Sequence, residues 1–225
     1  MDRAFRPAAL VPAYDAEATV GEVVRGLLRC APRVLVVDDG SRDKTAEAAR
    51  RAGAEVLRLN ENGGKGTAIR AGLAQMLASD LTHVAFVDGD GQHDPADLPA
   101  LLAAAREGDD FVVGSRMADP DETPGYRYRT NEIGGRVLSR MTGLEVEDGQ
   151  SGYRVLSADL LRRLDLNARG YIIETEILLK AARHVKRVRH VPVRVIYGSP
   201  SHYRPFRDTW AISWGAVYYK VFETD

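Results

Sequence analysis

The stretch His83-Val84-Ala85-Phe86-Val87-Asp88-Gly89-Asp90-Gly91-Gln92-His93 begins as an apolar run and ends in two carboxylates separated by one glycine. An apolar run of this kind predicts a buried β-strand whose polar end lies at the edge of a sheet. Asp88 and Asp90 point to the same side if the segment is extended. Their hard oxygen ligands suit Mg²⁺ or Mn²⁺. The stretch therefore indicates an enzyme that acts on a phosphorylated substrate, and an ordinary Asp-Gly turn is the competing interpretation.

Gln92 follows the two carboxylates and can bind a phosphate oxygen or a metal-bound water. The segment does not match an EF-hand calcium loop, because His93 stands where that loop needs glycine and Pro99 where it needs its last glutamate. Short motifs need support from the rest of the chain before they indicate a site.

Outward from this stretch, apolar strand-like runs alternate with segments of helical spacing. The expected strands are residues 8–11, 34–37, 55–59, 83–87 and 111–114, and the expected helices are 15–30, 43–52, 65–78 and 95–107. Pro12 is expected to stop the first strand, Asp15 to cap the first helix and Gly53 to close the second. The alternation predicts an α/β fold with a mostly parallel sheet and helices on both faces.

Polar clusters follow the first four strands, at residues 12–17, 38–41, 60–66 and 88–93. Ligands of such sheets bind beyond the carboxyl ends of the strands, so these clusters are expected to meet in one cleft. Asp38 and Asp39 can accept hydrogen bonds from a nucleoside base or ribose. The alternative for them is a helix-entry turn capped by Ser41 or Asp43.

The glycine-rich loop Asn62-Gly63-Gly64-Lys65-Gly66 places Lys65 and backbone N–H groups at a helix start, which favours anions. It is not a Walker phosphate loop, because Gly66 replaces the required Ser or Thr. Arginines that converge on a cleft can clamp phosphates, although each one singly is more often a surface residue. The candidates are Arg116, Arg127, Arg129, Arg204 and Arg207.

The second half of the chain has a different character. Residues 118–128 are rich in Pro, Asp and Gly and predict a mobile loop, followed by a helix over 129–141 that ends at Gly143. A polar turn at 148–154 precedes short helices, and 185–197 alternates as one or two strands. A basic loop at 199–207 leads to an aromatic-rich helix. Since no linker or repeat interrupts the chain, we expect a single domain.

Bulk properties exclude several classes of protein. The 31 basic residues nearly cancel the 32 acidic ones, so net charge does not indicate a nucleic-acid partner. Cys30 is the single cysteine, and the histidines lack zinc-like spacing. There is no Gly-x-Ser-x-Gly elbow, and no Gly-x-Gly-x-x-Gly opens the first helix. Without a signal peptide or a long apolar run, we expect a cytoplasmic protein, with peripheral contact at the membrane face left open.

Five segments resemble, in order and spacing, the motifs of the family 2 glycosyltransferases. They are Val11-Pro12-Ala13-Tyr14-Asp15, Val37-Asp38-Asp39-Gly40-Ser41-x-Asp43-x-Thr45, Asn62-x-Gly64-Lys65-Gly66, Val87-Asp88-Gly89-Asp90-Gly91-Gln92-His93 and Gly114-Ser115-Arg116. The chain is most similar to the dolichol-phosphate mannose synthase-like, or polyprenyl-phosphate glycosyltransferase, branch. The resemblance implies a Rossmann-like GT-A fold, a nucleotide-sugar donor and a divalent cation, Mg²⁺ or Mn²⁺. It divides the single domain 1–225 into a nucleotide-sugar half (1–117), an acceptor half (118–207) and an aromatic C-terminal helix (208–225).

The same resemblance implies roles for individual residues. The nucleoside pocket would be lined by Pro12, Tyr14, Asp38, Asp39 and Lys65, with Glu17 in place of a glutamate that the family has where this chain has Ala16. Asp88, Asp90 and Gln92 would form the metal motif. Arg116 and Arg129 would hold phosphate. Asp148 would act near the acceptor, which Arg127, Ser151, Arg204 and Arg207 would bind.

The expected reaction is transfer of a hexose, with inversion, from a donor of the GDP-mannose or UDP-glucose type to a polyprenyl or dolichyl phosphate. A phosphate acceptor is already anionic, whereas a hydroxyl acceptor would need Asp148 as a base. The hydroxyl acceptor and a non-catalytic nucleotide-binding homologue remain as alternatives. Aromatic residues at Trp210, Trp214 and Tyr218 share a helical face that can lie in a bilayer interface or dock on the protein body. The oligomeric state is not predicted.

Overall fold

A seven-stranded sheet forms the centre of the computed structural model, which describes residues 4–117 and 125–196. The strand order is β3-β2-β1-β4-β6-β5-β7. The strands are β1 (Pro7–Ala13), β2 (Val34–Asp38), β3 (Glu55–Arg58), β4 (His83–Phe86), β5 (Phe111–Ser115), β6 (Arg154–Ser157) and β7 (Arg189–Pro192). All neighbouring pairs are parallel except those of β6, which runs antiparallel to both β4 and β5. The sheet is therefore mostly parallel, as the alternation predicts.

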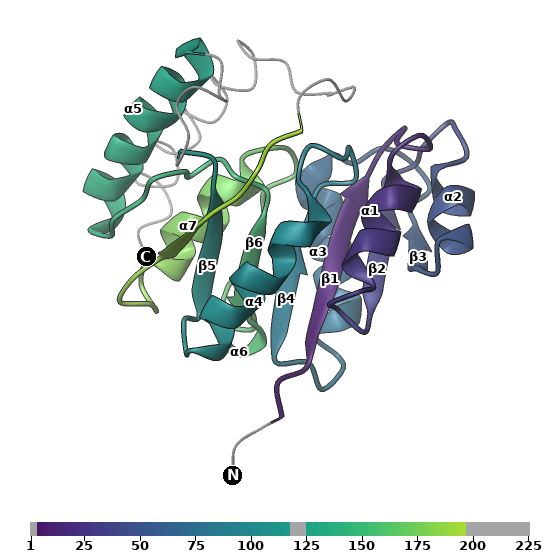
Figure 1. Cartoon of the computed structure of the whole chain (residues 1–225), viewed down its shortest axis with the longest axis horizontal. Coiled ribbons are helices and arrows are strands. Elements are labelled where there is room, and N and C mark those ends of the chain that lie inside the picture. Colours follow the sequence, from purple (N-terminus) through teal and green to yellow (C-terminus); the bar gives the residue numbers. More distant parts are fainter. Residues whose placement is uncertain (1–3, 118–124, 197–225) are drawn as a thin grey trace.

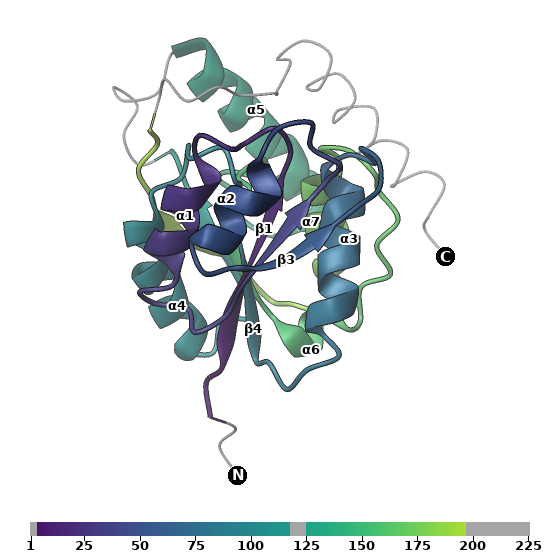
Figure 2. The same ribbon diagram turned by 90° about the vertical axis from the view of Figure 1, so that its right-hand side faces the viewer.

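Helices cover both faces of this sheet (Figures 1 and 2). One layer holds α1 (Val20–Leu27), α2 (Thr45–Arg51), the 3₁₀ turn η1 (Pro95–Asp97) and α4 (Leu98–Arg106). The other layer holds α3 (Lys65–Met76), α6 (Ala158–Leu161) and α7 (Ile173–Ala181). The long helix α5 (Gly125–Thr142) lies beyond the carboxyl ends of the parallel strands, at the top of both views. The chain thus forms one domain with its loops gathered at one end.

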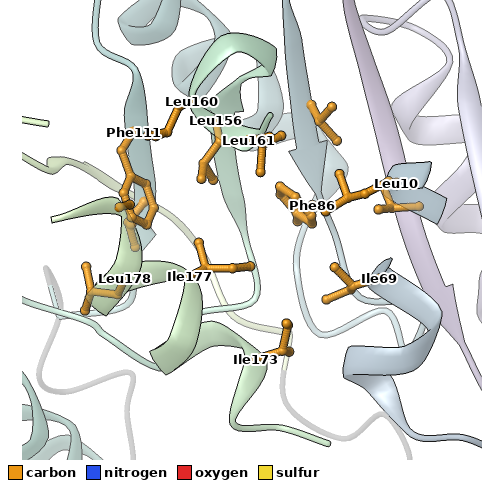
Figure 3. Close-up of a cluster of buried hydrophobic side chains, with 14 of the residues drawn as sticks. Leu10, Ile69, Phe86, Phe111, Leu156, Leu160, Leu161, Ile173, Ile177 and Leu178 are labelled. Atoms are coloured by element: carbon orange, nitrogen blue, oxygen red, sulfur yellow. The ribbon is translucent and has the colours of Figure 1, made fainter. Parts of the chain in front are cut away.

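Each face of the sheet has its own apolar core. Leu10 and Phe86 pack toward α3 and α7, in the cluster that Figure 3 shows. Val11 and Val87 belong to the opposite cluster, with α1 and α4. Successive residues of a strand face opposite sides, so a strand buried on both faces must be apolar throughout. This explains why the strands read as continuous apolar runs.

The five strands predicted in the first half are confirmed to within two residues, but two boundary predictions are wrong. β1 continues through Pro12, which lies beyond the last β1 residue paired with β4. A proline there needs to offer only its carbonyl, and the Gly89 N–H donates to it. Asp15 does not cap α1: it has a positive φ of 46°, and the helix begins at Val20 after Thr19.

The second half departs further from the prediction. Helix α5 begins at Gly125, so residues 125–128 are helical instead of part of a loop. Strand β6 occupies a segment where only short helices were expected. The predicted mobile loop at 118–124 and the predicted elements beyond residue 196 lie outside the described residues.

Strand β6 was missed because it opens with a charged residue that is nevertheless buried. The guanidinium of Arg154 donates to the carbonyls of Ser151, Glu174 and Gly149, each at 2.7 Å. Arg154 is only 2% exposed. Its hydrogen bonds join the turn before β6 to the start of α7, so this arginine holds the two segments together.

We predict that Arg154→Met lowers the free energy of unfolding by about 3 kcal/mol or more, because three buried carbonyls lose their donor. Urea unfolding followed by circular dichroism measures the change. Arg163→Met, at an exposed arginine just after α6, is the matched control and stays within about 0.5 kcal/mol of wild type. Equal stability of the two variants would show that Arg154 does not stabilise the fold in this way.

Candidate functional site

The loops that follow β1 and β2 are joined to one another and to the glycine loop before α3. Both carboxylate oxygens of Asp39 accept backbone N–H groups, from Gly63 at 2.9 Å and Gly64 at 2.8 Å. The hydroxyl of Ser41 accepts the Asp15 N–H at 3.0 Å. These segments therefore meet at the carboxyl edge of the sheet, as predicted. Because Asp39 takes two amides of the glycine loop, Lys65 is the main anion-binding group that the loop has left.

Lys65 forms the centre of the site. Its ammonium lies 2.6 Å from the Asp88 carboxylate and 2.5 Å from that of Glu174. Burial alone would lower the pKa of Lys65, but the two carboxylates outweigh it and raise the pKa. Burial likewise would raise the pKa of Asp88, and the Lys65 charge, assisted by His93 and Arg116, brings it below its ordinary value. Lysine and aspartate are both charged in this arrangement.

Asp90 lies in a different electrostatic environment from Asp88. Burial first, and the negative charge of Asp88 second, raise the pKa of Asp90 to about 6. Its Oδ1 accepts the backbone N–H of Gln92 at 3.0 Å. A raised pKa on a carboxylate beside a second carboxylate indicates that the two negative charges repel each other. A divalent cation bound between them would remove this repulsion.

The donor set fits a cation that is shared with a substrate. Among residues 4–117 and 125–196, no three His, Cys, Asp or Glu side chains gather into a complete metal cage. Mg²⁺ is commonly held by one or two carboxylates and completes its shell with water and substrate phosphates. Asp88 and Asp90 can supply these carboxylates, and Gln92 follows them directly in the chain.

Glycines let the backbone approach this cluster closely. A Cβ on Gly152 would lie 2.4 Å from Asp88 Oδ2 and 2.9 Å from the Lys65 ammonium. A Cβ on Gly89 would lie 3.0 Å from that of Ala13, and the Gly89 carbonyl accepts the Thr19 hydroxyl at 2.7 Å. The absence of side chains at Gly152 and Gly89 therefore sets the position of the carboxylates.

Arg116, which is partly exposed, and the buried Asp148 form a second ion pair. The guanidinium donates to the carboxylate twice, at 2.6 and 2.7 Å, and the Arg116 backbone N–H donates to it at 3.2 Å. Asp148 is fully buried. Burial would raise the pKa of Asp148, but the arginine outweighs burial and lowers it. Asp148 thus orients Arg116, whose charge in turn reaches Asp88.

The residues predicted for the nucleoside pocket lie around the ends of β1 and β2. Pro12 and Asp38 are buried, and Tyr14 is half-buried. Asp38 accepts the Ser41 N–H at 2.8 Å, as in the helix-entry turn that was its alternative interpretation. Glu17 is exposed and accepts the Lys44 N–H at 2.8 Å, so its carboxylate joins the same group of loops.

The predicted acceptor residues are less completely placed. Ser151 is fully buried, and its hydroxyl accepts the Tyr153 N–H at 3.2 Å, which gives it a role within its turn. Arg129 is exposed on α5. Arg127 belongs to the same helix, but its side chain is not described, and Arg204 and Arg207 lie outside the described residues.

A pocket of about 750 Å³ opens under α5. Its wall includes Met117, which follows Arg116 in the chain, and polar side chains of α5 and β7. The lining residues are Met117, Tyr128, Glu132, Arg136, Ser139, Arg140, Val146, Glu147, His190 and Pro192. The lining combines apolar side chains with basic and acidic ones, and Glu132 pairs with Arg136 at 2.7 Å.

Sequence reasoning missed two residues of the site. Glu174 and Arg154 are buried charged residues that come together with Lys65 and the 149–151 turn. A charged residue within an apolar segment was the available signal: Glu174 directly follows Ile172-Ile173, and Arg154 directly precedes Val155-Leu156. Charges in such positions are rarely buried unless they are paired.

Several known proteins resemble this chain in sequence. Residues 8–165 match the family model described as Glycosyl transferase family 2. An undecaprenyl-phosphate mannosyltransferase from Micrococcus luteus is 32% identical over 205 residues, which cover 85% of this chain and 84% of that protein. A UDP-N-acetylglucosamine–dolichyl-phosphate N-acetylglucosaminyltransferase from Methanococcus voltae is 29% identical and covers 94% of this chain and 93% of its own length.

A solved structure shows the same fold. Glucosyl-3-phosphoglycerate synthase from Mycobacterium tuberculosis, crystallised with Mn²⁺, UDP and phosphoglyceric acid, superposes with a TM-score of 0.73 at 23% identity. The match covers 95% of this chain and 76% of that one. The expected GT-A fold is confirmed.

We predict that Gly152→Ala lowers the free energy of unfolding by about 1–3 kcal/mol, because the added methyl group pushes apart the Asp88–Lys65 pair. Urea unfolding of the ligand-free protein measures it. Gly134→Ala is the control, since a Cβ there meets nothing within 4 Å. In α5 the exchange of glycine for alanine should stabilise the helix slightly. A Gly152→Ala protein as stable as wild type would show that the turn yields without strain.

Proposed function

This chain belongs to glycosyl transferase family 2 and is a glycosyltransferase, and we propose that it transfers a hexose from a nucleotide-sugar to a polyprenyl phosphate with inversion. Residues 1–117 would hold the donor and residues 118–207 the acceptor. The relatives named for undecaprenyl-phosphate and dolichyl-phosphate support this acceptor class. A donor of the GDP-mannose or UDP-glucose type remains the proposed class.

The observation that carries the choice of acceptor is the engagement of Asp148 by Arg116. A general base needs a pKa near the working pH and a free lone pair aimed at the substrate. Asp148 is buried, its pKa is lowered, and its carboxylate receives hydrogen bonds from the arginine side chain and backbone. A phosphate acceptor is already an anion and needs no base, so this arrangement favours a lipid phosphate over a hydroxyl.

The residues around Asp88 suit the diphosphate of the donor. A bound Mg²⁺ or Mn²⁺ would neutralise charge on the leaving nucleoside diphosphate, and Asp88, Asp90 and Gln92 would hold it. Support comes from the Mn²⁺ and UDP named for the synthase of the same fold. Lys65 and Arg116 supply preorganised positive charge next to this position. An acceptor phosphate oxygen attacks the anomeric carbon as the bond to the diphosphate oxygen breaks, and Arg116 and Arg129 would orient the two anions.

The pocket under α5 offers a place for the acceptor. Arg136 and Arg140 form part of its wall, and Arg136 pairs with Glu132, which also lines the pocket. The outer face of α5 carries two exposed aliphatic side chains, Ile133 (61% exposed) and Val137 (47%), next to the exposed Arg129. Within the described residues, no helix is long and apolar enough to cross a membrane. Because of its exposed aliphatic and basic side chains, we propose that this face of α5 makes peripheral contact with an anionic bilayer.

We predict that the protein transfers hexose to a short-chain polyprenyl phosphate and not to the corresponding polyprenol. A screen of radiolabelled GDP-mannose and UDP-glucose with Mg²⁺ or Mn²⁺ measures product by thin-layer chromatography. Transfer to the free alcohol would overturn the acceptor assignment. Donor binding without any turnover would favour a non-catalytic homologue.

Asp90→Ala should reduce this transfer by about 10²–10³-fold, the usual effect of losing one preorganised electrostatic contact. Its melting temperature should equal or exceed that of wild type, because Asp90 is unfavourably placed beside Asp88. Asp110→Ala, at the exposed start of β5, is the control and retains full transfer. Near-normal transfer by the Asp90 variant would exclude its proposed role.

We predict that Ile133→Asp/Val137→Asp weakens co-sedimentation of the full chain with phosphatidylglycerol-containing vesicles by about tenfold, since two aliphatic side chains leave the interface. Ala100→Asp/Ala103→Asp adds the same charge to exposed positions of α4 and leaves sedimentation unchanged. A chain truncated before residue 208 tests the aromatic segment. If only the truncation weakens binding, the contact lies there and not on α5.

A further inference from the structure

Glu174 is a buried carboxylate to which neither the motifs nor the proposed reaction assigns a role. It lies in the first turn of α7 and is 5% exposed. One oxygen binds the Lys65 ammonium at 2.5 Å, and the other is buried without a hydrogen-bond partner. An unsatisfied buried acceptor generally costs about 1–3 kcal/mol. The fold therefore pairs only one of the two oxygens of this carboxylate.

Glu174 is held rigidly from its own backbone. Its carbonyl accepts the Arg154 guanidinium at 2.7 Å, and Arg154 also binds the 149–151 turn. That turn leads to Gly152, which packs directly against Asp88 and Lys65. The carboxylate of Glu174 and the carboxylate of Asp88 therefore approach the same ammonium from two fixed elements, the start of α7 and the end of β4.

The shared ammonium has a consequence for Asp88. A lysine paired with a single aspartate would neutralise it and compete with a divalent cation for its oxygens. Here the Lys65 ammonium is divided almost equally, at 2.6 Å from Asp88 and 2.5 Å from Glu174. Glu174 therefore competes with Asp88 for the one ammonium that lies within ion-pair distance of both.

We propose that Glu174 is a positioning residue: it competes with Asp88 for the Lys65 ammonium, so that Asp88 can hold a divalent cation while Lys65 faces the donor diphosphate. This inference rests on the proposed function, because it assigns the cation and the diphosphate to that site. Without the Glu174 charge, Lys65 pairs with Asp88 alone, and a cation has to displace it.

The first experiment measures the pair itself, without ligand. A double-mutant cycle of Lys65→Met and Glu174→Gln, followed by urea unfolding, should give a coupling of at least about fivefold in the unfolding equilibrium constant. Additive effects of the two substitutions would show that the pair is not formed and would overturn the inference. This result does not depend on what the protein catalyses.

The second experiment measures cation binding. Titration of MnCl₂ with saturating UDP or GDP, followed by calorimetry, gives the Mn²⁺ concentration at half-saturation. Glu174→Gln should raise it about tenfold, since a buried charge partner is lost. Glu174→Asp keeps the charge but shortens the side chain, and it should raise the value at least threefold as well. Calorimetry of the nucleotide without metal shows whether Lys65 still meets the diphosphate.

Glu176→Gln is the matched control on the same helix. Glu176 is fully buried and binds the Asn167 and Ala168 N–H groups and Lys180, and not Lys65. This variant should lose stability but keep the Mn²⁺ midpoint within twofold. Normal binding by Glu174→Gln, or full recovery in Glu174→Asp, would overturn the positioning role. If wild type binds neither nucleotide with Mn²⁺, the proposed function fails. The double-mutant cycle without ligand still shows whether Lys65 and Glu174 form a pair.

Discussion

The pairing of the Lys65 ammonium with two buried carboxylates is the interaction on which the site depends. Asp88 comes from the end of β4, Glu174 from the start of α7 and Lys65 from the start of α3. A buried carboxylate without a cation is costly, so these three elements are favourable in their positions only when they meet. The ion cluster thereby joins the two halves of the chain across the sheet.

The cluster in turn requires an unusual strand. β6 enters the sheet antiparallel between β4 and β5, and it brings the turn with Gly152 against Asp88. The same strand begins with Arg154, which holds α7 by the Glu174 carbonyl. A parallel strand in this place would direct its preceding turn to the opposite edge of the sheet. The reversal of β6 is what places the 148–152 segment beside the donor-binding loops.

Much of the first half could be predicted from its sequence because the relevant signals there are local. The strands β1, β2, β4 and β5 are largely buried and read as apolar runs, whereas the edge strand β3 is half-buried. The polar clusters after the first four strands must meet at one edge of a parallel sheet. The alternation therefore predicted the cleft before any side-chain contact was known. The resemblance to family 2 glycosyltransferases added the roles of the residues.

The features that the sequence did not predict depend on contacts between residues far apart in the chain. β6 starts with a buried arginine, which the hydrophobic pattern reads as a surface residue, and its burial is explained only by carbonyls at Gly149, Ser151 and Glu174. Glu174 lies more than a hundred residues from Lys65. Asp15 looked like a helix cap because the pattern cannot show that its N–H is taken by Ser41 in the next loop.

The pair of Arg116 and Asp148 shows why the contacts of a carboxylate matter more than its position in a motif. From sequence, Asp148 was expected near the acceptor, and as a base only if the acceptor is a hydroxyl. In the structure its oxygens face Arg116 and the Gln150 N–H, and its pKa is lowered. Taking a proton from a substrate hydroxyl would neutralise this carboxylate and remove the charge on which its hydrogen bonds with Arg116 depend. A site built in this way favours an acceptor that arrives already ionised, and a phosphate monoester meets that requirement at neutral pH.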